Sequence, residues 1–597
     1  MKNFFGSLVG ALLGIVIVGL VLIFVVVNSL KSGFEQDKPA TDIKPGSVLF
    51  LKLDAPISER EPLNPFPSLS RITQNQNSIG LNLLLDQISK AKTDANIKGI
   101  YLEAPDVAAG MATVEDIRNA LLDFRKSGKF VVSYSEMYSQ KGYYLASAAN
   151  KILLHPEGGI EFKGLSAEIT FFKKMLEKLE IDVQIFRHGK FKSAVEPFDL
   201  EKMSDANRLQ TATYVNSLWD HMVDSIATSR KLSSDNLNQL AAGLRIRNAS
   251  DAVQYNLADA TVYGDEVWNE LRLQCKSLNN PDLILVRDYQ YAVPQKADTD
   301  EDNEEASEND PAIAVVYAVG EIESGLGDDN TIGSDRIAQA IADARNDENV
   351  KAIVLRVNSP GGSALASDVI WREVSLTKGQ KPIVVSMGDV AASGGYYIAC
   401  AADKIVAQPN TITGSIGVFG LLPNLKNMLE NKIGLTHDTV NSAPHADFGT
   451  TLRPVDTLEA EVLQQGVEDV YRTFINRVAE GRGISAADVD SIGQGRVWSG
   501  RDAKRIGLVD ELGGLQDAVK LAAKLAKITG TYRIKSFPAQ RSPFDDFFKK
   551  AGSQARAAAT EQELGMLAEE YQRFRRARLL LQLRSVQARI PYDVDIH

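Results

Sequence analysis

Cysteine, histidine and positive charge are all in short supply in this chain of 597 residues. Its two thiols, Cys275 and Cys400, are too few for a disulfide framework or for a zinc site of their own. The 66 Lys and Arg residues are outnumbered by 77 Asp and Glu residues, which leaves a net charge of −11. A nucleic-acid-binding protein carries a basic surface, so that class is excluded. We predict neither a metal ion nor a cofactor.

Charged side chains are missing from the segment Asn3 to Leu30, whose centre consists of Val, Ile, Leu, Gly and Phe. A helix that crosses a membrane needs roughly 20 such residues. A cleaved signal peptide has a shorter apolar core and a cleavage site between small residues, which this segment does not show. We therefore expect a transmembrane anchor at residues 1–30 and a polar linker at 31–46. Lysines flank both ends of the anchor, so charge does not decide its orientation.

Apolar residues are absent from a second segment, Lys296 to Asp310, which is strongly acidic. Such a composition is typical of a disordered linker, which we place at residues 291–311. A calcium-binding hand would need a glycine at the centre of a loop with fixed ligand spacing, and this run has none.

The two sides of the acidic segment resemble each other. Asn96–Leu102 matches Asn349–Leu355, and Gly142–Ile152 matches Gly395–Ile405. Both pairs are offset by 253 residues (349 − 96 and 395 − 142). The chain therefore contains a tandem duplication, with a first copy at 47–290 and a second copy at 312–538.

Each copy alternates short β-branched runs with longer helical patterns. In the second copy, Ala352–Val357 and Lys381–Met387 read as buried strands, and a helix is expected from about Ala364. Alternating strands and helices predict an α/β fold with a mainly parallel sheet. Functional sites in such folds lie in loops at the carboxyl ends of strands.

Two glycine-containing loops follow these strands. Asn358–Gly362 has adjacent glycines, Gly361 and Gly362, whose N–H groups can approach a ligand closely. Gly388–Tyr397 places Ser393 at the expected start of a helix, followed by Gly394. A serine there can act as a nucleophile, but it can equally serve as a helix N-cap with packing glycines behind it.

Comparison of the copies favours the hypothesis that Ser393 is a nucleophile. The counterpart of Ser393 in the first copy is Gln140, and the counterparts of Gly361 and Gly362 are alanines. Conversely, Lys192 of the first copy corresponds to His445 in the second. Each copy thus keeps one half of a Ser–Lys pair, and a purely structural cap gives no reason for this complementary loss. Among the histidines, His188 is the best alternative partner for Ser393 because it lies near Lys192.

Five motifs make the chain resemble a known family, the long form of the bacterial signal peptide peptidases called protease IV. They are Ser-Pro-Gly-Gly, Ala-Ala-Ser-Gly-Gly-Tyr, Gly-Ser-Ile-Gly (Gly414–Gly417), Lys-Ser-Ala-Val-Glu-Pro-Phe and Gly-Arg-Val-Trp-Ser-Gly (Gly495–Gly500). The resemblance implies a duplicated crotonase-like fold shared with the Clp proteases. It also implies the roles of the site residues, which are Ser393 as nucleophile, Lys192 as general base, Ser415 as the residue that orients the lysine, and Gly394 with Gly361 or Gly362 as oxyanion-hole donors.

The same resemblance implies membrane-associated apolar peptides as substrates, such as signal peptides left after export. It implies a single-pass protein of the inner membrane with a periplasmic catalytic part, and a homo-oligomer such as a tetramer. Two other hypotheses remain open from the residues. One is a crotonase-type acyl-thioester enzyme, which would use the glycine loop without the Ser–Lys pair, and the other is a non-catalytic membrane scaffold.

The last part of the chain, residues 539–597, lies outside the matching motifs. Apolar residues between Gln562 and Arg589 follow near-heptad spacing, which predicts a helical tail that packs on the body or on another subunit.

Overall fold

The computed structural model describes residues 43–63, 78–292, 307, 309–540, 587–589 and 595–596. The expected anchor at 1–30, most of the two linkers and tail residues 541–586 lie outside these ranges. Within the described ranges, no helix is both long enough and apolar enough to cross a membrane.

The first copy is built on a parallel sheet with strand order β10-β1-β4-β5-β6-β9. Side chains alternate along these strands, so Leu49 and Val131 face one buried cluster while Val48 and Val132 face another. Both faces are therefore apolar and both are covered, as parallel sheets require. The strands are β1 (Ser47–Lys52), β4 (Ile97–Glu103), β5 (Phe130–Tyr138), β6 (Lys151–Ile160), β9 (Ala260–Thr261) and β10 (Leu283–Leu285).

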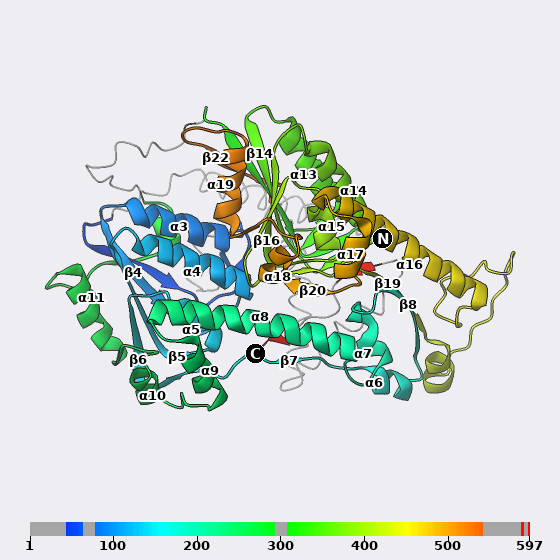
Figure 1. The fold of residues 1–597 in the computed structure, drawn as a ribbon, viewed down its shortest axis with the longest axis horizontal. Helices are drawn as coiled ribbons and strands as arrows, with labels where there is room; N and C mark the ends of the chain where they lie inside the picture. Colours follow the sequence, from blue (N-terminus) through cyan, green and yellow to red (C-terminus); the bar gives the residue numbers. More distant parts are fainter. Residues whose placement is uncertain are drawn as a thin grey trace, which may run out of the picture.

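Helices cover these two faces, with α11 on one side and the other large helices of the copy on the other (Figure 1). The helices are α3 (Leu81–Thr93), α4 (Met111–Arg125), α5 (Gln140–Ala146), α6 (Lys173–Lys178), α7 (Glu196–Asp199), α8 (Asp205–Arg230), α9 (Ser234–Ala242), α10 (Ala249–Gln254), α11 (Val267–Cys275) and α12 (Val286–Tyr289). Short strands β2 (Ile57–Ser58) and β3 (Ile79–Gly80) pair with each other.

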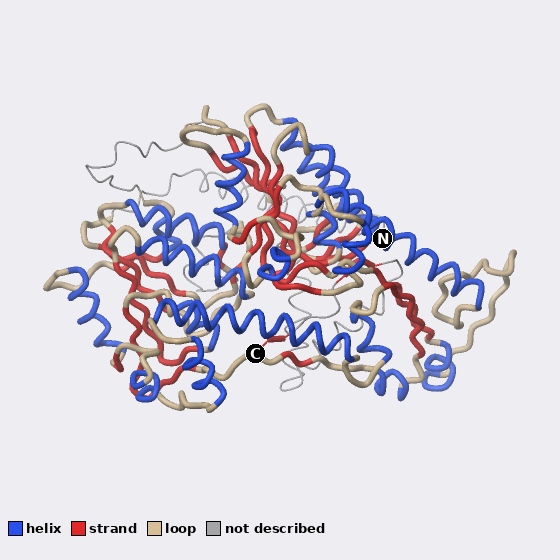
Figure 2. The backbone as a smooth tube through the Cα atoms, in the orientation of Figure 1, coloured by secondary structure: helices blue, strands red, loops and turns tan. Residues whose placement is uncertain are grey.

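The second copy repeats this plan with strand order β20-β18-β16-β14-β11-β22, and with β17 beside β16. Its central pairs, β11 with β14, β14 with β16 and β16 with β17, are all parallel. The strands are β11 (Ala312–Val319), β14 (Val350–Ser359), β16 (Ile383–Ala392), β17 (Lys404–Ala407), β18 (Ile412–Gly414), β20 (Val497–Ser499), β21 (Glu511–Leu512) and β22 (Arg533–Phe537). The predicted duplication of an α/β domain is confirmed, and Figure 2 shows two separate groups of strands.

The helices of the second copy also lie on both faces of its sheet, with α19 alone against one face. The helix expected from about Ala364 is α14, and the two expected strands are β14 and β16. The helices are α13 (Ser334–Asn346), α14 (Ala364–Thr377), α15 (Gly394–Ala399), α16 (Thr457–Arg482), α17 (Ala486–Ile492), α18 (Gly500–Arg505) and α19 (Leu515–Leu525).

A further sheet joins the copies, with strand order β13-β12-β15-β23-β19-β8. Strand β8 (Asp182–His188) belongs to the first copy and pairs antiparallel with β19 (Val418–Asn424) of the second, along their full lengths. These two strands extend together away from the body in Figure 1. The other members are β12 (Glu321–Glu323), β13 (Thr331–Gly333), β15 (Gly361–Ser363) and β23 (Gln587–Arg589).

The long helix α8 forms a second bridge between the copies. Its apolar residues Tyr214 and Leu218 pack on Val497 of β20, and Ser217 Oγ lies 2.7 Å from Ser499 Oγ. Figure 1 shows α8 crossing beneath both sheets. The first copy therefore contacts the second at two places. One is the pairing of β8 with β19, and the other is the packing of α8 on β20.

Only the last three residues of the predicted helical tail are described, and they are not helical, while residues 562–586 lie outside the described ranges. Gln587–Arg589 forms strand β23, and Asp595–Ile596 forms β24, which pairs with β7 (Ala167–Glu168). The near-heptad spacing extended the predicted helix to Arg589, but the backbone of β23 pairs with a strand on each side. Pairing with distant strands cannot be read from local spacing.

Candidate active site

Lys192 and Ser393 meet at the junction of the two copies. Lys192 Nζ lies 2.8 Å from Ser393 Oγ, 3.1 Å from Ser415 Oγ and 3.3 Å from the carbonyl oxygen of Ser415. Ser393 Oγ also lies 3.4 Å from the carbonyl oxygen of Gly417. All three side chains are 0% exposed. The structure thus brings together the serine, the lysine and the second serine that the sequence motifs single out.

Ser393 occupies a sharp turn between strand and helix. β16 ends at Ala392 and α15 begins at Gly394, so Ser393 alone makes the turn, with φ 55° and ψ −114°. A non-glycine residue in this conformation is strained, and such strain is characteristic of functional sites. The second residue after the serine must be a glycine for packing, because a Cβ at Gly395 would lie 2.8 Å from the carbonyl oxygen of Ser359. The turn therefore places Ser393 just past the carboxyl end of β16, and α15 packs closely against the glycine loop.

Lys192 is held by a loop that the second copy clamps. The N–H of Phe191 donates to the carbonyl oxygen of Gln494 at 2.9 Å. A Cβ at Gly495 would lie 2.6 Å from Lys192 Cβ, so the Gly-Arg-Val-Trp-Ser-Gly motif begins with a glycine because the lysine backbone passes so close. Gln210 of α8 donates to Phe191 O at 3.0 Å and to Ser193 Oγ at 2.9 Å, which fixes the loop from the other side.

Burial lowers the pKa of Lys192 well below 10.5. Removal from water disfavours the charged form of an amine. The hydrogen-bond partners of Nζ are two hydroxyls and a carbonyl. A neutral amine has two N–H donors, which match the two oxygens of Ser415, and one lone pair, which is left to face Ser393. The arrangement is that of a serine hydroxyl beside a base able to accept its proton.

The glycine loop lies next to this turn. Gly361 and Gly362 adopt φ 101° and φ 153°, and β15 packs against α15. The N–H of Gly361 donates to Ser359 Oγ at 3.1 Å. A Cβ at Gly362 would lie 2.1 Å from the carbonyl oxygen of Ile322, so only glycine fits there.

A buried ionic network, missed by the sequence reasoning, connects both loops to the first copy. Arg356 of β14 is fully buried, with Nε 2.9 Å from Glu59 Oε2 and Nη2 3.2 Å from Asp116 Oδ2. Asn358 donates to Glu59 Oε1 at 2.8 Å and accepts from the N–H of Val390 at 3.1 Å. The two carboxylates of the first copy therefore hold the ends of β14 and β16, from which the glycine loop and Ser393 continue.

In this network, burial and the charges of the neighbouring groups shift the pKa values in opposite directions. Burial by itself would lower the pKa of Arg356, but Glu59 and Asp116 raise it above its ordinary value. Burial raises the pKa of Asp116 to about 7, although Arg356 opposes the shift. No local pattern in the sequence signals these contacts, because the partners lie far apart in the chain.

The other candidates are engaged elsewhere. His188 Nδ1 lies 2.6 Å from Glu468 Oε2, and its ring stacks on Tyr471. Gln140, the counterpart of Ser393, fills the equivalent position in the first copy and accepts from the N–H groups of residues 163 and 164. That copy consequently has no hydroxyl at this point.

A cluster of possible metal ligands lies outside the site. His445, Asp456 and Glu459 offer ligand atoms within 4.8 Å of one another. Arg453 already donates to both oxygens of Glu459, at 2.6 and 2.7 Å. This guanidinium supplies the positive charge that a cation would bring.

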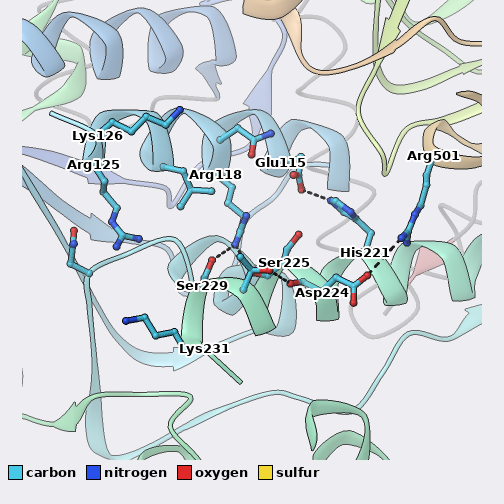
Figure 3. A pocket seen from close by; sticks show the side chains of 14 residues that line it. Glu115, Arg118, Arg125, Lys126, His221, Asp224, Ser225, Ser229, Lys231 and Arg501 are labelled. Carbon is cyan, nitrogen blue, oxygen red and sulfur yellow. Dashed lines mark hydrogen bonds and ion pairs between the residues drawn. The ribbon is translucent and has the colours of Figure 1, made fainter. Parts of the chain in front are cut away.

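An open concavity of about 800 Å³ lies between α4 and α8, away from Ser393 (Figure 3). Several of its charged side chains are already paired. Glu115 contacts His221 at 3.3 Å, and Arg118 donates to Ser225 O and Ser229 Oγ. Figure 3 shows these pairs spanning the space between the two helices, so the residues join α4 to α8 and offer no nucleophile with a base.

Comparison with known proteins identifies the family of the chain. Peptidase family S49 matches residues 123–277 and 375–529, one region in each copy, and the Clp protease family matches residues 325–413. Protease 4 of Salmonella typhi is 40% identical over 83% of this chain and 78% of its own length. Protease 4 of Haemophilus influenzae is 35% identical over 88% and 86%.

A plant protein is similar over a comparable length. The chloroplastic serine protease SPPA of Arabidopsis thaliana is 32% identical over 82% of this chain and 71% of its own. Two S49 regions in one chain, and relatives matched over most of their length, decide the family. The chain belongs to peptidase family S49 and is a serine peptidase of the protease IV type.

Proposed function

We propose that this chain is a membrane-anchored serine endopeptidase in which Ser393 is the nucleophile and Lys192, from the other copy, is the general base. The single observation that carries the assignment is the buried 2.8 Å contact between Lys192 Nζ and Ser393 Oγ. A lysine at its ordinary pKa of about 10.4 is neutral in only about one molecule in a thousand at pH 7.4. Burial lowers the pKa of Lys192, which makes the neutral base available.

The chemistry follows from this geometry. Lys192 accepts the proton of Ser393 as Oγ bonds to the substrate carbonyl carbon. The lysine then gives that proton to the leaving amine, the peptide C–N bond breaks, and an acyl-enzyme remains. Lys192 next takes a proton from water, whose oxygen attacks the ester, and returns it to Ser393 as the acid product leaves. Ser415 orients Lys192, because its carbonyl oxygen and its hydroxyl each accept a hydrogen bond from Nζ.

Oxyanion stabilisation is assigned to the N–H groups of Gly362 and Gly394. The N–H of Gly361 is occupied by Ser359 Oγ, so its role is to shape the loop. Gly394 directly follows the nucleophile, and its N–H belongs to the first turn of α15, where the helix dipole favours negative charge.

We infer apolar, membrane-associated peptides as substrates, including signal peptides left after export. One of the curated relatives is described as a putative signal peptide peptidase, from Enterococcus faecium. Leu365 and Val369, 72% and 40% exposed, lie one turn apart on α14 just after the glycine loop. Apolar side chains at this position favour an apolar peptide at the site. A periplasmic location and a homo-oligomer such as a tetramer belong to the same proposal.

Hydrolysis of an apolar reporter peptide tests the function. Ser393→Ala and Lys192→Ala should each abolish turnover while retaining the wild-type circular dichroism spectrum. Lys192→Arg should be equally inactive, because a guanidinium stays protonated. The exposed Lys190 provides the matched control, and Lys190→Ala should keep near wild-type activity. Normal turnover by any of the three site variants would refute the assignment, and tight acyl-CoA binding by an inactive wild type would favour the thioester enzyme.

A further inference from the structure

Positive charge gathers in the concavity between α4 and α8, although the chain as a whole carries a net charge of −11. Two carboxylates line the concavity, and both already have partners. Glu115 contacts His221 Nε2 at 3.3 Å, and Asp224 lies 3.7 Å from Arg501 of the second copy. The lining cations outnumber the carboxylates, and they are Arg118, Arg125, Lys126, Lys231 and Arg501.

Arg118 is almost completely buried in the wall of this concavity, with 3% of its surface exposed. Its Nη2 donates to Ser225 O and Ser229 Oγ, and its Nε donates to Tyr144 O at 3.3 Å. These acceptors are neutral, and no carboxylate among the described residues forms an ion pair with Arg118. Nη1 makes no hydrogen bond within the described part of the chain, and Figure 3 shows the guanidinium directed from α4 toward α8. A buried cation therefore has N–H donors left for a ligand.

Arg125 lies two helical turns further along the same face of α4. Its Nη1 donates to Ala148 O at 2.7 Å, whereas its buried Nε has no hydrogen-bond partner in the residues that the structure describes. Burial, and after it the positive charge of Arg118, lower the pKa of Arg125. The two guanidinium groups are thus close enough to repel each other, and an anion between them would remove this repulsion.

The carbonyl groups that bind the two arginines belong to the C-terminal end of α5. Such an end carries about half a negative charge, which Tyr144 O and Ala148 O present to the arginines. Half a charge does not neutralise two guanidinium groups. Lys231, the C-cap of α8, adds a third cation that has no ion pair within the described ranges. The excess of positive charge therefore favours a ligand with more than one negative charge.

The donors in the concavity suit a phosphate group. Arginine forks bind phosphate oxygens in pairs. Ser229 Oγ accepts from Arg118, so its own O–H can donate to a ligand. A phosphate ester carries a charge of about −1.5 to −2 and three acceptor oxygens, whereas a carboxylate carries a single charge on two oxygens. Figure 3 shows Arg118, Arg125 and Lys231 bordering the same space between the helices.

We propose that the concavity between α4 and α8 binds a phosphate group, supplied by inorganic phosphate or by a phospholipid headgroup, with Arg118, Arg125 and Lys231 as its charged partners. The site goes beyond the proposed peptidase function and does not depend on it.

The helices that form this site also support the active site. Asp116 of α4 pairs with Arg356, and Gln210 of α8 holds the loop of Lys192. A ligand that contacts both helices in the folded protein alone stabilises this arrangement by mass action.

Isothermal titration calorimetry of the detergent-solubilised full chain with sodium phosphate, at an ionic strength held constant with sodium chloride, tests the site. We expect one phosphate per chain and a dissociation constant in the millimolar range or tighter. Arg125→Gln should weaken binding by about tenfold or more, because a hydrogen bond between charged groups contributes that much. Lys231→Gln should weaken binding several-fold. The matched control is Lys276→Gln, since Lys276 is also an exposed C-cap in the left-handed conformation, on α11, and it should bind phosphate like the wild type.

The absence of binding to the wild type, or unchanged binding in either folded variant, would overturn the proposal. Circular dichroism shows whether each variant is folded, and the exposed Lys231 keeps the test decisive if Arg125→Gln does not fold. Glycerophosphoglycerol, the water-soluble headgroup of phosphatidylglycerol, distinguishes the two sources of phosphate. Tighter binding of this diester than of inorganic phosphate would assign a lipid headgroup, and binding that is no tighter would assign the free ion.

Discussion

Replacing Lys192 by methionine should change the pH dependence of stability in a way that reports the protonation state of the buried amine. Methionine is close to lysine in length and has no charge. Burial lowers the pKa of Lys192 in the folded protein well below 10.5, whereas the unfolded chain has an ordinary lysine. Between these two pKa values the unfolded state binds one more proton than the folded state, so wild-type stability rises with pH.

The magnitude follows from the proton count. One proton contributes about 1.4 kcal/mol per pH unit to the free energy of unfolding. The difference between wild type and Lys192→Met should therefore shift in favour of the wild type by up to about 3 kcal/mol from pH 7 to pH 9. At pH 7.4, deprotonating a free lysine costs about 4 kcal/mol, and hydrogen bonds to Ser393 and Ser415 offset about 1 kcal/mol each. The methionine variant should thus be the more stable protein at neutral pH, although inactive.

Urea unfolding followed by tryptophan fluorescence at pH 7, 8 and 9 measures this difference. Lys190→Met, which removes an exposed side chain two positions away, controls for the loss of a lysine. A difference between wild type and Lys192→Met that is constant over this range would show that the folded protein keeps the amine charged. The reasoning about a neutral general base would then be refuted.

Three further outcomes follow from the geometry. Ser415→Ala removes the hydroxyl 3.1 Å from Lys192 Nζ and should lower kcat roughly 10- to 100-fold with little change in KM, so an unchanged kcat would argue against an orienting role. Gly362→Ala should be inactive yet folded, because its Cβ would meet Ile322 O at 2.1 Å and displace the loop, and full activity would contradict the assigned oxyanion donor. Arg356→Met leaves two buried carboxylates without their partner and should lose about 3–5 kcal/mol, whereas Asp116→Asn should lose much less, because burial raises the pKa of this carboxyl to about 7. Thermal unfolding distinguishes the two variants, and equal losses would contradict the network.

The pairing of Ser393 with Lys192 could be predicted because the duplication allows each copy to be compared with the other. Gln140 stands where the second copy has Ser393, and His445 stands where the first has Lys192. These differences interrupt an otherwise shared pattern, so they stand out without any structure. The parallel sheets could also be predicted, since buried strands such as Ala352–Val357 are apolar except for a single arginine.

Contacts between distant segments could not be foreseen. β8 has no strand at its counterpart positions 435–441, so the duplication gives no hint that β8 would pair with β19. Arg356 and Glu59 are separated by almost 300 residues. The sequence shows an arginine inside an apolar strand but does not indicate which carboxylate pairs with it. β23 has near-heptad apolar spacing upstream, which favours a helix until its two neighbouring strands are known.

Active-site labelling of Ser393 with a serine-reactive phosphonylating probe tests the central claim most directly. The probe reacts only with an activated hydroxyl, and peptide mapping identifies the modified residue. We predict that the wild type is labelled at Ser393, that Lys190→Met is labelled at the same rate, and that Lys192→Met is not labelled although it is folded. Equal labelling of Ser393 in the wild type and in Lys192→Met would show that another group activates the serine, and the account of a base supplied across the two copies would be wrong.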